Sequence, residues 1–536
     1  MSTQEESDIS TPPPSFEQGG GDDLIMQTEE DTEVQLDERS MNIFSGIVKE
    51  LKNGAELTRM SLPYFILEPQ SMTERLTDFL NHSNLLIDAL KHQDPVERFY
   101  HLSRWYISGF HSQNHGVKKP YNPVLGETFK CFWTHDDGSR TWYLAEQVSH
   151  HPPITAFHIE NKQHGIRIKM HLEVVMKWKG NSIMIKPVGQ GMFYLRKPVN
   201  KPWGELITED DFLTDFEVER YDFSFPAFYC RGIIIGKMKL ELCGEIILTC
   251  PKNGITAKFD FKPKGFFGSK YNQFDGTIVE LTGDEKVDSK FKGKQLFQMR
   301  GDWMSVSEYR DCREPPTHNN GEWAEFLNIP SLPKTPRYIQ QVSDQLEYES
   351  RVVWSTMSTA LITQDDDTAA AEKNRIENKQ RGEYKERNER KEGWRQRYFH
   401  DANGKWMLNW LGAHEEEKYE EEKQKMSLEE RLKLREEATR GGRQDASVIG
   451  IELTAFNIPD ATTLTGPPPM GEHTKKGKDI DVRVTTFPDL PLTVGHPWPM
   501  FAGKKKEAKG TPLVPEPAAP AEEQPAPAPE QEDKTG

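Results

Sequence analysis

Two adjacent histidines, His150 and His151, carry the clearest chemical signal in this sequence. They follow a stretch that alternates like a strand, residues 142–148, and they precede Pro152 and Pro153. Proline lacks the N–H that a strand ladder uses and disfavours a helix in the residue before it, so the histidines are predicted to lie at a strand end. Such a pair offers hydrogen-bond donors and, when protonated near neutral pH, positive charge, which suits a phosphate.

Other interpretations of the histidine pair compete with phosphate binding. A metal site would need further His, Cys or carboxylate ligands at a known spacing, and the sequence has no HExxH and no paired CxxC. A catalytic base would need a nucleophile partner, and the sequence singles out none. The third alternative is two ordinary histidines at a strand end. We therefore predict no metal, no cofactor and no catalytic residue.

Two further stretches place polar residues where a ligand could use them. Lys119, Tyr121 and Asn122 belong to KPYNPVLGET (119–128), whose Pro, Asn and Gly residues predict a structured turn with Lys119 available to a polar ligand. Lys373, Glu377 and Arg381 are spaced i, i+4, i+8 in a charged helical stretch. At 100° per residue they drift about 40° per step and share one helix face. Alone, that spacing is typical of an exposed ladder of salt bridges.

Helical patterns precede the strands that position these residues. A short amphipathic helix begins near Asn42, and its apolar face continues toward the domain; such a helix packs on the domain, covers an opening or touches a membrane. Its apolar face consists of Ile43, Phe44, Ile47, Val48 and Leu51, and Met60 and Leu62 continue the apolar segment beyond the helix. Ser71 with Glu74 predicts a capping box for a helix reaching Leu90, and Asp94-Pro95 begins another helix.

A strand pattern with period 2 follows. Asp136–Ser139 predicts a hairpin turn between strands at 129–133 and 142–148, and another pair of strands brackets 161–165. The run 166–178 alternates without a break and would extend about 43 Å, with a charged face that includes Lys169 expected to be in water. Further strands are predicted at 231–235, 238–248 and 255–261.

Serial hairpins of long strands favour an antiparallel meander that closes into a barrel, because closure removes exposed edges. A barrel of this size can enclose a cavity for an apolar ligand. A two-sheet sandwich fits the same periodicity. The predicted class is mainly β (α+β): a large, near-closed antiparallel barrel with helices before and after it.

The C-terminal part returns to helix near Asp365, and aromatic residues then suggest a cap on the core: Trp394, Tyr398, Phe399, Trp406 and Trp410. The predicted order of regions is a disordered acidic segment (1–40), a lid (41–70), the barrel with its first helices (71–364), a helix with the aromatic cap (365–412), a charged helix (413–445) and a mostly disordered tail (446–536).

Composition limits the class of partner. The 536 residues carry a formal net charge of -17, and the first 40 contain 12 Asp and Glu against Arg39 alone. Because the acidity lies mostly in the tails, nucleic acid is not expected as a partner. The sequence shows no secretory signal and no 18-residue apolar run, and its five cysteines are scattered, which together predict a cytoplasmic protein with reduced thiols.

The octet EQVSHHPP (146–153) resembles a signature of the oxysterol-binding-protein-related lipid-transfer family, and KPYNPVLGE (119–127) resembles that family's second signature. The Lys373–Glu377–Arg381 spacing also occurs in the family after the barrel. The resemblance covers roughly residues 41–412. It implies a near-closed barrel around a lipid tunnel with an N-terminal lid, and exchange of phosphatidylinositol 4-phosphate for a second lipid between membranes.

The resemblance also implies roles for residues. His150 and His151 would bind the 4-phosphate, with Arg381 and Lys373 adding charge. Lys119 and Asn122 would hold the inositol phosphate or glycerol region, Glu377 would orient the basic groups, and Ile43 to Leu62 would form the lid. Convergent charge-assisted donors are what a phosphate monoester requires.

The second lipid is predicted from a resemblance to one branch. Tyr121 and the stretch 139–158 look most like the phosphatidylserine-transferring branch, while sterol-transferring members more often carry Leu or Phe at that position. The sequence shows no pleckstrin-homology domain, ankyrin repeats or membrane anchor. We expect transient contact with membrane surfaces, a protein tether, and a place at contact sites between endoplasmic reticulum and plasma membrane. A phosphoinositide or sterol sensor without net transport, and a hydrolase with a histidine base, are the rival functions.

Overall fold

The computed structural model describes residues 16–18, 33–35, 49, 63–112, 118–208, 211, 214–233, 237–264, 270–340, 342–402 and 405–408. All seven predicted lid residues, the predicted charged helix 413–445 and the tail 446–536 lie outside the described residues, as does Trp410. Among the described helices none is both long and apolar enough to cross a bilayer.

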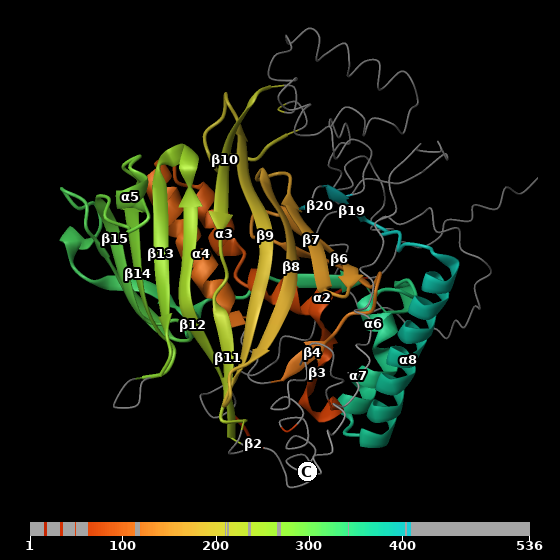
Figure 1. The fold of residues 1–536 in the computed structure, drawn as a ribbon. Coiled ribbons are helices and arrows are strands. Elements are labelled where there is room, and N and C mark those ends of the chain that lie inside the picture. Colours follow the sequence, from red (N-terminus) through yellow and green to blue (C-terminus); the bar gives the residue numbers. More distant parts are fainter. Residues whose placement is uncertain are drawn as a thin grey trace, which may run out of the picture.

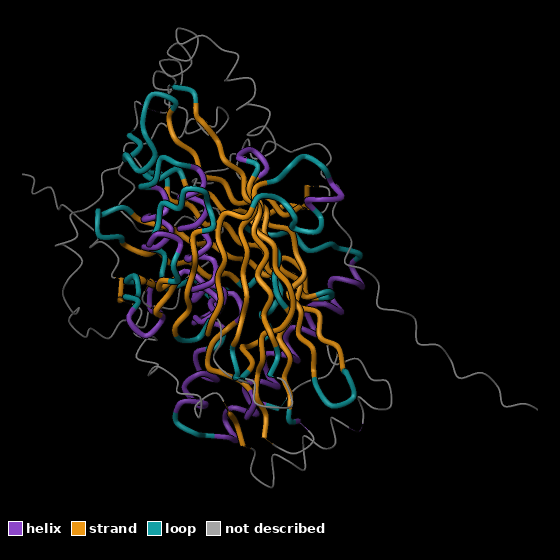
Figure 2. The backbone as a smooth tube through the Cα atoms, turned by 90° about the vertical axis from the view of Figure 1, so that its left-hand side faces the viewer, coloured by secondary structure: helices purple, strands orange, loops and turns teal. Residues whose placement is uncertain are grey.

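Within the described residues, one 16-stranded sheet forms the body of the molecule (Figures 1 and 2). Its order is β1-β18-β5-β6-β7-β8-β9-β10-β12-β13-β14-β15-β16-β17, with β11 pairing β12 and β9, and β2 pairing β12. The N-terminal strands are β1 Phe16–Gln18, β2 Glu33–Gln35, β5 Thr128–Thr134, β6 Arg140–His150, β7 Pro153–Asn161, β8 Ile166–Trp178 and β9 Ile183–Pro198. The others are β10 Phe216–Phe223, β11 Ala227–Arg231, β12 Lys237–Cys250, β13 Ile255–Lys262, β14 Gln273–Glu280, β15 Gln295–Asp302, β16 Val306–Asp311, β17 Ala324–Asn328 and β18 Arg337–Gln340.

Each described pairing in this sheet is antiparallel, and from β5 to β9 and from β12 to β17 consecutive strands pair, as in the predicted meander. The pairings of β1 with β18, β18 with β5 and β2 with β12 join strands far apart in the sequence. The thirteen-residue strand β8 matches the run 166–178. A single continuous ladder excludes the two-sheet sandwich. The ladder ends at β17, and in the part of the chain that the structure describes β17 does not pair with β18. At this seam Arg104 Nε donates to the Phe326 carbonyl at 2.9 Å, so a helix side chain covers the open edge. The barrel is therefore near-closed.

The helices lie in two groups (Figure 1). The first group contains α2 Met72–Arg75, the 3-10 helix η3 Leu76–Leu80, α3 Asn84–Leu90 and α4 Pro95–Ser112. The second contains α6 Ser350–Val353, α7 Ser355–Ile362 and α8 Asp366–Arg390, beside the parallel pair β3 Leu67–Ser71 and β4 Lys119–Tyr121. The short α5 Glu285–Asp288 joins β14 to β15, and β19 Phe399–Ala402 pairs β20 Lys405–Leu408.

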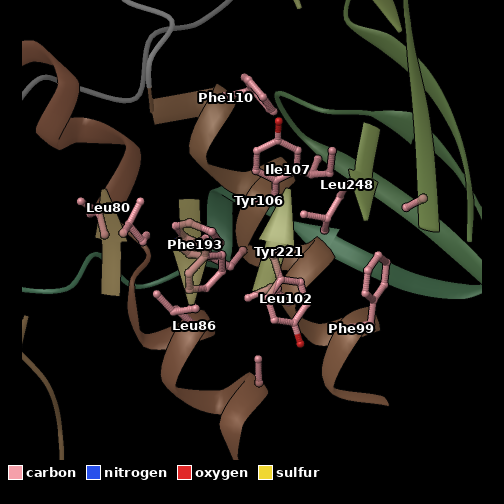
Figure 3. Packing of buried hydrophobic residues seen from close by; sticks show 14 of the residues in the cluster. Leu80, Leu86, Phe99, Leu102, Tyr106, Ile107, Phe110, Phe193, Tyr221 and Leu248 are labelled. Atoms are coloured by element: carbon pink, nitrogen blue, oxygen red, sulfur yellow. The ribbon is translucent and has the colours of Figure 1, made fainter. Parts of the chain in front are cut away.

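The main core lies where the first group of helices meets the sheet. Apolar side chains of α3 and α4, among them Leu86, Leu102 and Tyr106, pack with Phe193 and Tyr221 from the strands (Figure 3). Phe99 and Leu102 are fully buried. Each such side chain contributes roughly 1.5–3 kcal/mol when it leaves water. The apolar periodicity of 95–110 thus fixes α4 against the inner face of the sheet.

Several local predictions need correction. The helix predicted from Ser71 to Leu90 is divided into α2, η3 and α3. Ser71 makes no side-chain cap, because its hydroxyl donates to the buried carboxylate of Glu127 at 2.5 Å. Lys169, expected in water, is buried. The segment 1–40 departs from the predicted disorder at β1 and β2, where short extended stretches pair with the edges of β18 and β12.

Of the residues in the predicted aromatic cap, Tyr398 and Phe399 are buried in one cluster with Phe132, Trp142 and Leu144. All five cysteines fall in described residues, and each is a free thiol there.

Candidate functional site

The two signature stretches are joined through their backbones. Gly126 N–H donates to the Gln147 carbonyl at 2.9 Å, and Gln147 N–H donates to the Glu127 carbonyl at 2.8 Å. The end of KPYNPVLGE therefore pairs with the middle of EQVSHHPP. Sequence analysis treated the two stretches as separate contributors, whereas the fold makes them one structural unit at the start of β5 and the end of β6.

Glu127 is the internal anchor of this unit. It is fully buried and accepts from the Ser71 and Thr73 hydroxyls at 2.5 and 3.1 Å, from Val124 N–H at 3.0 Å and from the Trp354 indole N–H at 2.8 Å. Burial raises its pKa, and these donors oppose the rise. Glu127 thus ties the turn, the α2 start and α6–α7 together, and its position in the interior makes it a structural residue.

Glu146 fixes the chain that follows α8. Its two carboxylate oxygens accept the N–H groups of Arg397 and Tyr398, each at 2.7 Å, while burial raises its pKa to about 7. Gly126 adds a steric requirement: its φ is +77°, and a Cβ there would lie 2.1 Å from the Trp394 ring. Glu127, Glu146 and Gly126 therefore hold the backbone of the two signature stretches in place. The remaining polar residues of these stretches lie at the edge of this structural unit.

His150 lies at the end of β6, as the Pro152-Pro153 stop predicts. Its Nδ1 is 3.2 Å from the Pro123 carbonyl, so Nδ1 carries the proton, and Nε2 meets the Gln380 side-chain amide of α8. Burial, with the nearby charges of His151 and Lys119, lowers its pKa to about 4, against the opposing effects of the Pro123 carbonyl and Glu377. His150 is neutral at pH 7 in this state. The positive charge that a protonated His150 would offer to a phosphate is therefore absent at neutral pH in this state.

His151 is exposed, in contrast to its neighbour. The two imidazole rings meet edge to face, with centroids 4.8 Å apart. One histidine is thus locked between the turn and α8, and the other faces solvent at the same edge.

Three cations from two elements lie around Glu377, whose charge acts on His150. Lys119, on β4, is partly buried, and its pKa is lowered to about 8 by burial and by the charge of Lys373, against the opposing charges of Glu68 and Glu377. On α8, Glu377 accepts from Lys373 Nζ at 2.5 Å and from Arg381 Nη2 at 3.1 Å. Lys373 turns toward the domain with 11% of its side chain exposed, whereas Arg381 is 64% exposed. The predicted ladder exists, and its Lys373 end reaches the histidine site.

The sequence of α8 explains this placement. Asp365 caps the helix by accepting Thr368 N–H at 3.1 Å, Asp366 and Asp367 occupy the first turn, and Arg387 and Arg390 occupy the last, as the helix dipole favours. Ala369 and Ile376 are the buried positions of the helix. Lys373 and Gln380 lie on the same side at helical spacing.

Tyr121 and Asn122 differ from the other candidates. Tyr121 is buried, stacks on Trp354 with ring centroids 4.5 Å apart, and lies 3.0 Å from Ser358 Oγ through its hydroxyl. Burial raises its pKa to about 12. The ring packs the turn against α6 and α7. Asn122 is exposed beside it, and the ligand roles of both residues stay predictions.

Sequence analysis did not identify Gln380, which contacts His150, or Glu68, whose charge acts on Lys119. Gln380 could have been found from helix geometry, because it lies seven residues, about two turns, after Lys373 and therefore on the same face of the helix. Glu68 could not, because it reaches Lys119 through the pairing of β3 with β4. The assembled site offers an imidazole pair, an amide and three cations around one bridging carboxylate, an arrangement that suits a phosphate anion.

Comparison with known proteins identifies the family of this chain. Residues 46–361 match the family model described as oxysterol-binding protein. Similar curated proteins are the oxysterol-binding protein-like protein OBPa of Candida albicans, 33% identical over 69% of this chain and 78% of the relative, and the oxysterol-binding protein homolog 7 of Saccharomyces cerevisiae, 33% identical over 65% and 73%. The human oxysterol-binding protein-related protein 5 is 33% identical over 68% of this chain, which spans 38% of that relative's length.

Two solved structures have a similar fold. The Osh1 ORD domain in complex with cholesterol superposes with a TM-score of 0.55 at 23% identity, covering 70% of this chain and 88% of that one. The Osh3 ORD in complex with PI(4)P from Saccharomyces cerevisiae gives 0.51 at 16% identity, covering 74% and 95%.

Proposed function

The chain belongs to the oxysterol-binding protein family, and from that premise we propose that it is a lipid-transfer protein that exchanges phosphatidylinositol 4-phosphate for phosphatidylserine between membranes. The observation that carries the proposal is the convergence of His150, Lys119 and Lys373 from β6, β4 and α8 on one edge of the barrel. The 4-phosphate dianion would be held by His151, Lys119, Lys373 and Arg381, and its charge would favour protonation of His150.

Each residue has a part in this proposal. Asn122, exposed at the same turn, donates to the inositol or glycerol region, and Glu377 holds Lys373 and Arg381 in place before the lipid arrives. The lid, Ile43 to Leu62, shields the acyl chains, whose burial is worth about 0.8 kcal/mol per CH₂. We place the exchange on the cytoplasmic side of membranes, at contacts between endoplasmic reticulum and plasma membrane, with a protein tether supplying the targeting.

Both lipids would use one cavity, so each displaces the other, and the reaction needs no covalent step. The first test is mass spectrometry of the lipids that co-purify with the full chain and with the His150→Ala/His151→Ala variant. A matched control is His171→Ala, a half-buried histidine on β8 outside the site. We expect phosphatidylinositol 4-phosphate and phosphatidylserine on the wild type and the control, and loss of the phosphoinositide from the double variant.

The outcomes separate the rival functions. Retention of phosphatidylinositol 4-phosphate by the double variant would remove the phosphate role of the histidines. A sterol in place of phosphatidylserine would move the protein to sterol exchange. Transfer between liposomes should be rapid for the full chain; binding without transfer would indicate a sensor, and hydrolysed lipid would indicate a hydrolase.

A further inference from the structure

His92, Glu97 and His101 form a cluster in the first group of helices, on other elements than the phosphate site of β4, β6 and α8. His92 lies in the connection between α3 and α4, and Glu97 and His101 are i, i+4 on α4, so they share one face of that helix. One ligand atom from each of the three residues lies within 4.8 Å of the other two. The imidazole rings of His92 and His101 are stacked, with centroids 3.9 Å apart and planes at 11°.

The backbone that carries His92 is held rigidly. Arg98 Nη1 donates to the carbonyls of His92 at 2.6 Å and Gln93 at 3.1 Å, and the Arg98 guanidinium is itself paired with the buried Glu219. The Gln93 side chain exchanges two hydrogen bonds with the backbone of Trp203, at 2.7 and 2.9 Å. The connection is therefore fixed on α4 before any ligand binds, which is the preorganisation that a metal site needs.

The carboxylate of Glu97 is also oriented. His318 Nε2 lies 3.0 Å from Oε2, and Arg313 Nη1 lies 2.7 Å from Oε1. The Thr317 hydroxyl also donates to Oε1, at 3.4 Å. Such outer contacts fix the direction of a ligating carboxylate, and Oε2, with His318 as its one contact among these, keeps a second lone pair for an ion. Arg313 shares its charge with Asp311 at 2.7 Å, so Glu97 is not its sole counter-ion.

We propose that His92, Glu97 and His101 bind a divalent transition-metal ion of the Zn²⁺ class. Two imidazoles and one carboxylate are the donor set that this ion accepts, with a fourth position for water. Because a metal lies in the plane of each ligating ring, the stacked rings must tilt apart. The backbone of His92 stays fixed, and its partly exposed side chain rotates to supply that movement. The ion ties the α3–α4 connection to α4.

The sequence prediction of no metal rested on HExxH and paired CxxC motifs. This cluster has the spacing H-x4-E-x3-H and crosses the start of a helix, and neither motif covers that spacing.

The test is titration of the EDTA-treated full chain with ZnCl₂ by calorimetry, beside thermal unfolding with and without the ion. The variants are His92→Gln/His101→Gln, with His171→Gln as the matched control outside the cluster. We expect one zinc ion bound at micromolar concentration or tighter and a raised unfolding temperature in wild type and control, and loss of both effects in the double variant. His318→Phe, which removes a contact to Glu97, should weaken binding roughly tenfold.

Equal binding by wild type and double variant would overturn the proposal and assign the zinc to other side chains. Absence of binding by the wild type at millimolar ZnCl₂ would overturn it as well. The Co²⁺ form gives a second readout, because thiolate charge-transfer bands would place the ion on a cysteine, whereas nitrogen and oxygen ligands give d–d bands alone. Lipid exchange should be unchanged in every variant, so failure here is distinguishable from failure of the proposed function.

Discussion

Inside the barrel one cation, Arg98, forms an ion pair with one anion, Glu219. At the edge of the barrel one anion, Glu377, forms ion pairs with two cations, Lys373 and Arg381. The Arg98 and Glu219 side chains are 2% and 1% exposed and share two hydrogen bonds, Arg98 Nε–Oε2 being 2.8 Å. Glu377 is 28% exposed, and Lys373, Arg381 and Lys119 surround it. The interior pair completes the fold, whereas at the edge the cations outnumber Glu377, and that excess is the charge that the proposed phosphate ligand would use. Substitutions in the two regions should therefore affect different measurements.

The largest effect on stability is expected for the ion pair inside the barrel. Arg98→Met leaves the Glu219 carboxylate buried beside Tyr221 and Asn253 without its cation, and removing one partner of a buried pair costs about 3–5 kcal/mol. Denaturant unfolding followed by tryptophan fluorescence measures the change. The double variant Arg98→Met/Glu219→Met, which removes both charges, should recover much of the loss. An Arg98→Met protein as stable as wild type would show that the interior pair is not matched as described.

The second effect is a pH dependence carried by His150. Its folded-state pKa of about 4 lies below the ordinary 6.5, so between these values the unfolded chain binds more protons. The contribution of His150 is therefore complete above pH 6.5 and is lost as the pH falls toward 4, by about 3 kcal/mol. Stability curves of wild type and His150→Asn should converge over that window. His101 and His135, whose pKa values burial also lowers, act equally in both proteins and cancel.

Bound phosphatidylinositol 4-phosphate should have the opposite effect on the protonation of His150. A phosphate beside His150 favours the imidazolium, so phosphatidylinositol 4-phosphate binding should take up protons. Calorimetry in buffers of different ionisation enthalpy measures that uptake. If the stability curves of wild type and His150→Asn stay parallel over this pH range, and lipid binding takes up no protons, then His150 is not a buried group in contact with the phosphate.

The third effect is on binding rather than folding. Lys373→Met removes a cation that faces the site, and Lys379→Met removes one that is 71% exposed on the same helix. We expect Lys373→Met to weaken phosphatidylinositol 4-phosphate binding about tenfold or more, which is about 1.4 kcal/mol, with little change in stability. Lys379→Met should leave both unchanged. Equal losses in the two variants would mean that α8 acts through its general charge rather than through the Lys373 position.

Much of this arrangement is predictable from the sequence, and the rest depends on tertiary contacts. The strand ends, the barrel and the α8 face follow from periodicity, proline stops and helix geometry, all of which are local. Lys373 and His150 are 223 positions apart, and only packing of α8 on the turn brings Gln380 to His150. The neutral state of His150 depends on the same tertiary packing: burial and the charge of Lys119 lower its pKa, against the opposing effect of the Pro123 carbonyl, and none of these contacts is visible in the sequence.

The smallest effect tests whether Tyr121 belongs to the ligand or to the frame. Tyr121→Phe keeps the stacking on Trp354 and removes the hydroxyl beside Ser358, so the loss of stability should be about 0.5–1.5 kcal/mol. Because the ring is buried among α6 and α7 side chains, the lipids recovered by mass spectrometry should not change. Ser358→Ala, which removes the other partner, should lose a similar amount and serves as the control. A switch from phosphatidylserine to sterol in Tyr121→Phe alone would place the hydroxyl in contact with the lipid and extend the ligand-binding edge to the turn itself.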